Sequence, residues 1–348
     1  MRRLLLCTLL LCSCATPRAS APAVAPAAAP TDGVQLEHVR EHFTTLSADD
    51  MEGRLTGTPG AARAAQYIAA QLKAFGVTPA GDEGYFQRVP LALMTRRNGR
   101  KVPVLVPPHV SMDQVPEELR LTGLNVVGLI PGADPVLRDE AVLVGAHYDH
   151  LGVGEPVHGD GIYNGADDNA SGVTAVLEVA RALAQGPRPR RTVVLLATTG
   201  EEQGLLGTEW YLQNPIFPLE RTVANLEVEM IGRPDPKAGG AGRAWLTGYE
   251  RSSMGEALAA AGIPIVADPH PAQNFFERSD NYALALRGIP AHTLSSYNLH
   301  ADYHTPADDA ARADLAHMTQ VIDSAVRAVR LLTDGPAPQW KEGMRPVQ

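Results

Sequence analysis

The chain has 348 residues, 45% of them hydrophobic and 20% charged, which is the composition of a soluble globular protein with a sizeable core. Its formal net charge is −9, and the acidic residues are spread along the sequence. Because no long lysine- or arginine-rich block marks a nucleic-acid surface, we expect no nucleic acid among its partners. The length allows one large or two small domains.

The first 14 residues, MRRLLLCTLLLCSC, have the pattern of a secretory signal, two arginines followed by a short apolar run. The run is too short to span a bilayer as a permanent helix. Residues 11–14 resemble a bacterial lipobox, in which the signal is cut before Cys14 and this cysteine then carries lipid. The alternative is a plain signal cleaved near Ala19 or Ala21. We therefore expect export to the bacterial cell envelope with a lipid anchor at Cys14 as the only membrane contact, or a periplasmic or secreted protein under the alternative.

All three cysteines of the chain lie in this segment, at positions 7, 12 and 14, so the mature chain has no internal disulfide and no thiolate metal ligand. Residues 15–32 are rich in alanine and proline and predict an extended linker. We expect a single folded domain over residues 33–334 and a loosely ordered tail over residues 335–348.

Hydrophobic periodicity predicts two amphipathic helices, over residues 60–76 and 172–185. In the first, Ala64, Ile68 and Leu72 share one face, and Gly76 is placed to end the helix. Three short apolar runs predict strands that are buried on both faces, as in a helix-covered parallel sheet, at residues 123–130, 141–146 and 192–198. This order of elements indicates an α/β layered domain, in which sites form at the carboxyl ends of strands.

Side chains that can bind metal gather in five segments, several of them directly after predicted strands. They are His147, Asp149 and His150 in GAHYDHLG, Asp167 and Asp168 in NGADDNASG, Glu201 and Glu202 in TTGEEQG, Glu227 and Glu229 in NLEVEMIGR, and His304 in DYHTPADD. Each segment alone has an ordinary explanation, such as a surface histidine, a helix N-cap pair or a solvated glutamate pair. Together, at successive strand ends, they predict a metal site built from histidine and carboxylate.

With these segments, and with DDMEGRLTGTPG at 49–60 and GIPAHTLSS at 288–296, the chain resembles the co-catalytic dizinc exopeptidases of metallopeptidase family twenty-eight. This family includes secreted bacterial aminopeptidases, glutamate carboxypeptidase-like enzymes and glutaminyl cyclases. The resemblance covers nearly all of residues 35–330. It implies a three-layer α/β/α fold with a central mixed, mostly parallel sheet.

The resemblance also implies the metal ligands and the catalytic base. The ligands of two Zn²⁺ ions per chain, with Mn or Co as possible substitutes, would be His147, Asp168, Glu202, Glu229 and His304. Asp168 would bridge the two metals, and Asp149 would orient His147. Glu201 would act as general base toward a hydroxide that bridges the metals.

Two assignments keep a rival. Glu229 stands where the family often has aspartate, and Glu227 would lie on the same strand face. We favour Glu229 because it directly precedes the MIG turn. Asp167 is a weaker rival to Asp168, since the following NASG spacing favours Asp168. The resemblance implies a cis peptide between Asp168 and Asn169.

The sequence around His304 predicts a helix start that would fix this histidine. Thr305 would be the N-cap, with Pro306 at the first helical position and Asp308 at the third. The other histidines considered are expected to be structural or to lie near the pocket; they are His150, His158, His292 and His300. The segment FFERSDNYAL, with Ser279 and Asp280, resembles a family segment that lines the substrate pocket.

We expect a zinc-dependent aminopeptidase that hydrolyses N-terminal residues from peptides. A glutaminyl cyclase-like enzyme, which would use one zinc, is an alternative from another reaction class, and a non-enzymatic binding module that kept the fold is a third. A carboxypeptidase would need a cationic pocket for the substrate carboxylate, for which Arg233, Arg278 and Arg287 are candidates.

Overall fold

The computed structural model describes residues 33–97, 99 and 101–347. The predicted signal, the Cys14 anchor and the linker over residues 15–32 lie outside the described residues. Within the described ranges no helix is both long and apolar enough to cross a membrane.

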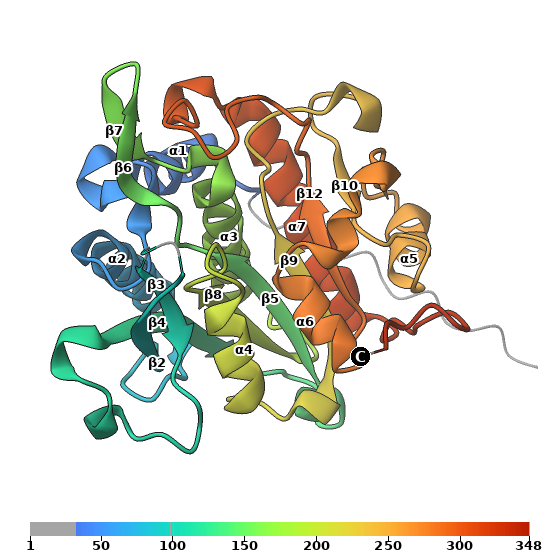
Figure 1. The fold of residues 1–348 in the computed structure, drawn as a ribbon. Helices are drawn as coiled ribbons and strands as arrows, with labels where there is room; N and C mark the ends of the chain where they lie inside the picture. Colours follow the sequence, from blue (N-terminus) through green and yellow to red (C-terminus); the bar gives the residue numbers. More distant parts are fainter. Residues whose placement is uncertain (1–32, 98, 100, 348) are drawn as a thin grey trace, which may run out of the picture. The chain divides into compact units, whose positions relative to one another are not determined.

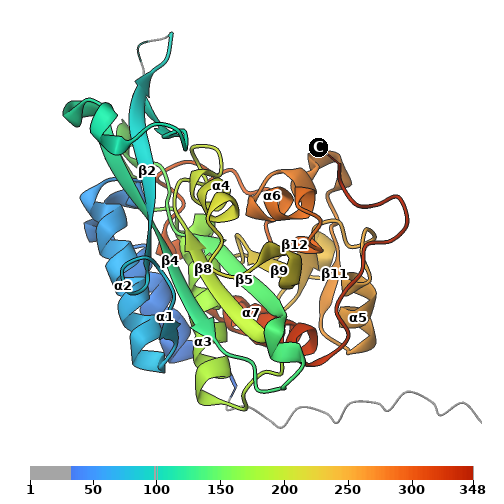
Figure 2. The same cartoon turned by 90° about the horizontal axis from the view of Figure 1, so that it is seen from below.

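Helices cover both faces of a twisted sheet (Figures 1 and 2). The helices are α1 (Leu36–Leu46), α2 (Pro59–Phe75), α3 (Gly172–Gln185), α4 (Leu206–Gln213), α5 (Met254–Ala260), α6 (Asp280–Leu286) and α7 (Leu315–Asp334). The strands are β1 (Thr78–Pro79), β2 (Phe86–Thr95), β3 (Lys101–Leu105), β4 (Arg120–Ile130), β5 (Ala141–His147), β6 (Gly152–Val157), β7 (Asp160–Tyr163), β8 (Thr192–Thr198), β9 (Thr222–Val228), β10 (Ala244–Leu246), β11 (Ile265–Ala267) and β12 (Ala291–Ser295).

The main sheet has ten strands in the order β11-β10-β12-β9-β5-β8-β4-β2-β3, with β1 paired to β4. Strands β12, β9, β5 and β8 at its centre are parallel neighbours. The predicted α/β/α fold with a mixed sheet and a parallel centre is confirmed. One expectation was wrong: β4 runs antiparallel to β8. The connection from β4 to β5, residues 131–140, is too short for the helical crossover that two parallel strands need.

The apolar strands alternate between two cores because successive side chains point to opposite faces of a sheet. On β5, Val142 and Val144 join the core formed with α1, α2, α3 and α7, whereas Leu143 joins the core formed with α4 and α6. On β8, Val193 and Val194 divide in the same way. Burial on both faces explains why these strands read as continuous apolar runs.

Both predicted helices are present, as α2 and α3. The hydroxyl of Thr58 accepts a hydrogen bond from the Ala61 amide and caps α2, and Pro59 occupies its first turn. Gly76 ends α2 in the left-handed conformation, with φ of 82°.

The helix expected to begin at Thr305 is absent from the described structure, so this prediction was wrong. Residues 301–307 form turns, and the next α-helix, α7, begins at Leu315 with Asp314 as its N-cap. The carboxylate of Asp308 instead accepts hydrogen bonds from the backbone amides of Asp167 and Asp168. Long-range pairing of this carboxylate therefore overrides the local capping signal.

The tail for which the sequence suggests loose order lies against α5 and α6. The indole Nε1 of Trp340 donates to the Gly288 carbonyl at 2.9 Å, and the ring of Trp340 lies 5.7 Å from that of His292. His292 on β12 is fully buried: its Nδ1 donates to the Thr247 carbonyl and its Nε2 pairs with the Ser252 hydroxyl, each at 2.7 Å. Burial lowers the pKa of His292 to about 4. His292 is therefore a neutral structural histidine.

This histidine makes the stability depend on pH. Its folded-state pKa lies below its ordinary 6.5, so between pH 6.5 and 4 the unfolded chain takes up a proton that the folded chain does not. The free energy of unfolding should fall as pH drops through this window, by up to about 3 kcal/mol from this group. Urea unfolding at pH 7 and pH 4.5 measures the effect: His292→Gln should lose less stability between the two than the wild type. The exposed His109→Gln should keep the wild-type difference, and an unchanged difference in His292→Gln would contradict the assignment.

Candidate metal centre

The carboxyl ends of three neighbouring parallel strands deliver polar side chains to one edge of the sheet. His147 is the last residue of β5, and Glu229 directly follows β9. Glu201 and Glu202 follow β8 after two residues. Asp168 comes from the turn that precedes α3. Residues far apart in the sequence therefore meet because the strands are parallel and in register.

Asp168 faces a different histidine with each of its carboxylate oxygens. Its Oδ1 lies 3.3 Å from His147 Nε2, and its Oδ2 lies 3.2 Å from His304 Nε2. His304 comes from the loop between β12 and α7 and lies 3.1 Å from Glu202 Oε2. One carboxylate thus stands between two separate sets of potential ligands.

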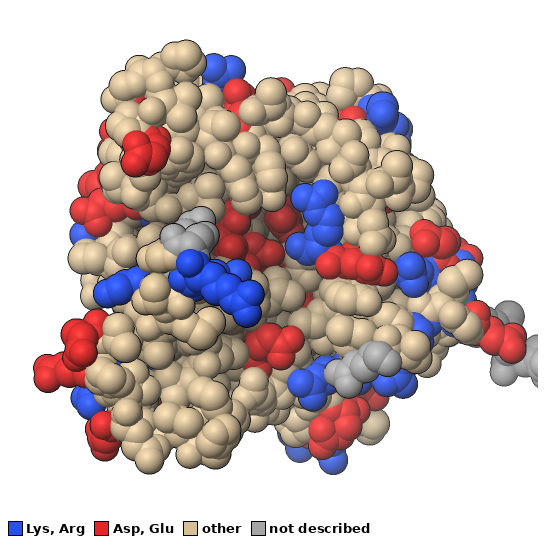
Figure 3. Space-filling view, in the orientation of Figure 1, with Lys and Arg blue, Asp and Glu red and all other residues tan. Residues whose placement is uncertain are grey.

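These two sets are defined by ligand atoms that all lie within 4.8 Å of one another. The first contains His147, Asp168 and Glu229, and the second contains His150, Asp168, Glu202 and His304. Acidic side chains gather in a hollow near the centre of the face shown in Figure 3. The structure therefore brings together all five ligands that the family resemblance implied, and adds one histidine.

His150 was expected to be structural or to lie near the pocket, and the structure places it among the potential ligands. It is fully buried, and its Nδ1 lies 2.8 Å from Glu202 Oε1 and 3.8 Å from Asp168 Oδ2. The available signal was its position three residues after His147, in the turn that leaves β5. The sequence could not show that this turn bends the imidazole toward Glu202.

Several buried ligand atoms make no hydrogen bond with the described residues. They are His147 Nε2, both ring nitrogens of His150, Glu202 Oε1 and His304 Nε2. Buried polar atoms normally have a hydrogen-bond partner, so several acceptor atoms that face one another without such a partner indicate a site for a cation. Imidazole and carboxylate donors without thiolate suit zinc, and also manganese or cobalt. The residues present therefore fit a divalent metal.

The rival carboxylates are occupied elsewhere. Glu227 is buried on β9, where its Oε2 accepts from Asn225 Nδ2 at 3.3 Å and covers Gly145. Asp167 accepts from the Gly232 amide at 2.6 Å, and its other oxygen lies 2.9 Å from His300 Nε2. Neither joins the two ligand sets among the described residues.

The backbone around Asp168 is fixed by side chains rather than by regular structure. The expected cis peptide between Asp168 and Asn169 is present. Asn169 Nδ2 donates to the Val228 carbonyl at 3.0 Å, and its Oδ1 accepts from the Met230 amide at 3.2 Å. The side-chain amide of Asn169 therefore links the Asp168 turn to the end of β9 next to Glu229.

Asp149 organises the turn that carries the paired glutamates. Its carboxylate accepts from the backbone amides of Glu201 at 3.1 Å and Glu202 at 3.4 Å. Toward His147, the nearer contact is the Asp149 backbone carbonyl, 3.2 Å from Nδ1, while the carboxylate lies 3.9 Å away. Asp149 thus links the end of β5 to the end of β8.

Crowding of buried carboxylates shifts the proton affinities of the site. Burial raises the pKa of Glu201 well above its usual range, and raises the pKa values of Glu229 and Asp149 each to about 7. Burial lowers the pKa of His304, but the adjacent carboxylates of Asp168 and Glu202 outweigh this effect and raise the pKa to about 10. The site therefore favours bound positive charge.

A buried arginine supports the loops beneath the site. Arg54 is fully buried and donates to four backbone carbonyls, those of Leu46, Tyr148, Asn164 and Gly165, at 2.6–2.8 Å. Tyr148 follows the last residue of β5, and Gly165 precedes the Asp168 turn, so one guanidinium joins the two segments. A planar guanidinium holds five donors in a fixed fork, which lysine cannot reproduce.

We therefore expect Arg54→Lys to lower the free energy of unfolding by at least about 3 kcal/mol, because buried carbonyls lose charged donors. Arg63→Lys is the matched control. Its ion pair with Glu52 spans 2.9 Å between side chains that are 40% and 46% exposed, so the change should stay below about 1 kcal/mol. Urea unfolding of both variants measures the difference, and equal losses would refute a special role for Arg54.

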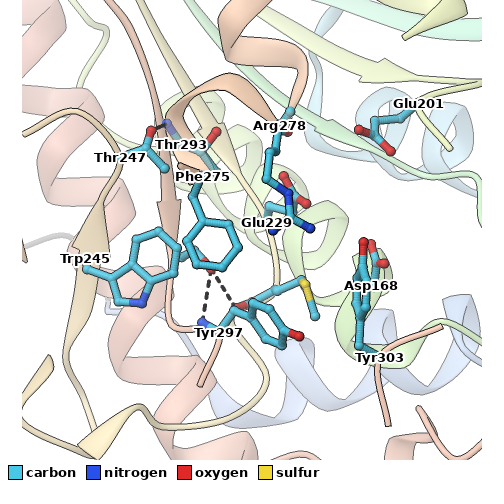
Figure 4. A pocket seen from close by; sticks show the side chains of 13 residues that line it. Asp168, Glu201, Glu229, Trp245, Thr247, Phe275, Arg278, Thr293, Tyr297 and Tyr303 are labelled. Atoms are coloured by element: carbon cyan, nitrogen blue, oxygen red, sulfur yellow. Dashed lines mark hydrogen bonds between the residues drawn. The ribbon is translucent and has the colours of Figure 1, made fainter. Parts of the chain in front are cut away.

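A pocket opens beside the ligand atoms, with roughly 500 Å³ of space that is partly open to solvent. Figure 4 shows the rings of Trp245, Phe275 and Tyr297 on one side of it, and Glu201, Asp168 and the ring of Tyr303 on the other. Its lining residues include Asp168, Glu201, Glu229, Trp245, Phe275, Arg278, Tyr297 and Tyr303. The rings of Trp245 and Phe275 stack at 5.3 Å between centroids. A pocket lined by aromatic rings and a few charged groups suits a small organic ligand.

The three candidate arginines have different surroundings. Arg233 is paired with Asp302 at 2.6 Å and lies 3.6 Å from Asp308. Arg287 is exposed at the end of α6 and does not line the pocket. Arg278 alone of the three lines the pocket.

The chain belongs to peptidase family M28: the model of this family matches residues 125–329. This confirms the family resemblance and places the chain among the peptidases, a class of hydrolases. A vacuolar membrane protease from Aspergillus fumigatus is 34% identical over 216 residues, which are 58% of this chain and 20% of that protein. The chain thus matches about a fifth of the length of this curated relative.

Solved structures share the fold at low sequence identity. A zinc aminopeptidase from Bacillus subtilis superposes with a TM-score of 0.63 at 16% identity, over 90% of this chain and 99% of that one. A glutaminyl cyclase from Porphyromonas gingivalis superposes with a TM-score of 0.57 at 17% identity, over 85% and 98%. Because enzymes of two reaction classes share it, the fold does not choose between them.

Proposed function

We propose that the protein is a zinc-dependent exopeptidase, an aminopeptidase that removes N-terminal residues from peptides. The observation that carries this proposal is the carboxylate of Asp168, whose two oxygens face His147 and His304. A carboxylate between two ligand sets is what a pair of metal ions requires.

The proposed metal complement is two zinc ions that share Asp168. His147 and Glu229 complete one set, and Glu202 and His304 complete the other, with His150 beside Glu202. When bound, such a pair of ions would polarise the scissile carbonyl and activate a water molecule. A glutaminyl cyclase-like reaction, expected to need one zinc, is the alternative that two complete sets disfavour.

Glu201 is the proposed general base. It lines the pocket yet belongs to neither ligand set, and Asp149 holds its backbone amide at 3.1 Å. Burial raises the pKa of its carboxyl, which suits a group that must accept a proton and release it again. Its carboxylate takes a proton from the attacking water and passes it to the nitrogen of the leaving amine.

The carboxylates of the pocket favour a substrate with a free amine. Asp168, Glu201 and Glu229 line one side, where a free N-terminal amine can donate hydrogen bonds to carboxylate oxygens. The aromatic side, with Trp245 and Phe275, offers an apolar surface to a neighbouring side chain. These features support release of N-terminal residues over cleavage within a long chain.

Metal analysis with matched peptide substrates tests the proposed function. We expect two zinc ions per chain, hydrolysis of peptides with a free N-terminus, and at least about tenfold slower hydrolysis of their N-acetylated forms, since acetylation removes the free amine that donates to the carboxylates. A chelator should abolish activity, and zinc should restore it. Release of C-terminal residues from N-acetylated peptides would contradict the proposal and indicate a carboxypeptidase. Cyclisation of N-terminal glutamine by a protein with one zinc ion would indicate a glutaminyl cyclase.

The variant Glu201→Gln separates the base from the ligands. It should keep zinc content and melting temperature but lower kcat by about a hundredfold or more, the usual contribution of a general base. Glu220→Gln, an exposed glutamate before β9, should retain wild-type kcat. Near-normal turnover by zinc-loaded Glu201→Gln would rule out the role of Glu201.

A further inference from the structure

We propose that the tip of the β2–β3 hairpin is a docking site for an acidic segment of the peptide substrate, several residues beyond the amino acid that is released. This inference rests on the proposed function and specifies the peptides that the enzyme prefers. The basic residues at this tip that the structure describes are Arg96, Arg97 and Lys101, and all three are exposed. Together they are called the basic tip.

The hairpin is basic although the chain as a whole is acidic. The chain carries 39 aspartates and glutamates and a net charge of −9, yet residues 84–112 contain no acidic residue and hold four arginines and one lysine. Arg88, at the base of the hairpin, is paired with Glu83 at 2.6 Å. No carboxylate of residues 33–97, 99 or 101–347 lies within 4.0 Å of a side-chain nitrogen of the basic tip, the distance at which an ion pair is counted. The basic tip therefore presents positive charge to solvent.

The strand register places this hairpin beside the candidate metal centre. Phe86 of β2 pairs with Val126 of β4, and Val126 pairs with Ala197 of β8. Because β4 is antiparallel to both neighbours, β2 runs in the same direction as β8, toward the edge of the sheet that carries Glu201. Two strand spacings separate β2 from β8, which is about 10 Å.

Strand β2 continues far beyond this edge of the sheet. It ends at Thr95, nine residues after Phe86, whereas β8 ends one residue after Ala197. At about 3.3 Å per residue, β2 reaches roughly 25 Å past the end of β8. Figure 2 shows β2 projecting past α4 and α6, and Figure 3 shows lysine and arginine side chains next to the hollow, on the side where β2 and β3 lie in Figure 1. The hairpin therefore forms one side of the approach to the pocket.

An extended peptide fits this arrangement. In the proposed reaction the N-terminal residue lies at the ligand atoms, so the rest of the peptide must extend out of the pocket toward solvent. A span of about 25 Å corresponds to seven or eight extended residues. Exposed charges attract each other over about a Debye length, about 10 Å at 0.1 M salt, so acidic side chains about five to eight positions after the scissile bond come within reach of the basic tip.

An anionic membrane offers the same charge, but the position of the basic tip favours a peptide. The hairpin projects from the edge of the sheet at which the pocket opens. A bilayer that lies against the basic tip would therefore face the entrance through which a peptide must pass. We assign the surface to the substrate for this reason.

Matched peptides test the docking site on the zinc-loaded enzyme. Leu-Gly-Gly-Gly-Gly-Glu-Glu-Glu-amide is compared with the same peptide that carries three glutamines in place of the glutamates. At low salt the acidic peptide should show a kcat/KM about fivefold or more above that of the neutral one, expressed in KM with kcat unchanged. The ratio should approach one at about 1 M sodium chloride, where the Debye length is about 3 Å.

Variants then assign this preference to the hairpin. The triple variant Arg96→Gln/Arg97→Gln/Lys101→Gln should bring the acidic-to-neutral ratio close to one at low salt and leave kcat for the neutral peptide unchanged. The matched control removes two arginines and one lysine that are exposed on other elements, Arg40→Gln/Lys73→Gln/Arg138→Gln, and it should retain the ratio. The proposal is overturned if the wild type shows no preference, or if the preference survives in the first triple variant.

Binding measurements separate this proposal from the proposed function. Calorimetry on zinc-loaded Glu201→Gln, with and without the three substitutions in the basic tip, gives Kd for both peptides without turnover. Tighter binding of the acidic peptide that disappears with those substitutions supports the docking site, even if the wild type hydrolyses no peptide and the proposed function fails. Hydrolysis by the wild type with equal Kd values for both peptides overturns the docking site alone.

Vesicles test the competing partner. Wild type and triple variant are sedimented with vesicles of phosphatidylglycerol and of phosphatidylcholine. Equal sedimentation of the two proteins with both lipids supports the assignment to the substrate. A loss of binding to phosphatidylglycerol that is specific to the triple variant, together with no preference between the peptides, would overturn the proposal and assign the basic tip to a membrane surface.

Discussion

The site depends on one carboxylate being held between two histidines. Asp168 faces His147 from the end of β5 and His304 from the loop before α7, and both approaches are 3.2–3.3 Å. The backbone of Asp168 is fixed by Asp308, whose oxygens accept from the amides of residues 167 and 168, each at 3.0 Å. Since Asp308 lies four residues after His304, one loop positions both the Asp168 carboxylate and a histidine that faces it.

This arrangement brings several carboxylates together in the protein interior, where the repulsion between like charges is strongest. Buried carboxylates repel one another and lose hydration, and the raised pKa values of Glu201, Glu229 and Asp149 express that cost. Within the described chain, Arg54 places one buried cation below the site, but its donors are used on backbone carbonyls. The remaining imbalance is what bound dications would offset.

The pocket beside the ligand atoms is lined by charged groups of both signs. On one side stand the carboxylates that also belong to the centre, Asp168 and Glu229, and on the other stands Arg278, stacked on Phe275. Two opposite charges attract each other more strongly in a partly enclosed pocket than in water, because the effective dielectric constant is lower there. Charges of both signs therefore act on any ligand that enters the pocket.

The sequence by itself determined the chemical types of the ligands, the buried strands and the helices α2 and α3, because apolar periodicity and strand-end motifs are local signals. It grouped His147, Asp168 and His304 only through resemblance to a family. Tertiary structure alone decided that β4 runs antiparallel, that Thr305 starts no helix, that His150 turns toward Glu202, and which arginine reaches the pocket. Each of these outcomes depends on contacts between segments distant in the chain, whose free energies exceed the weak local preferences that a sequence displays.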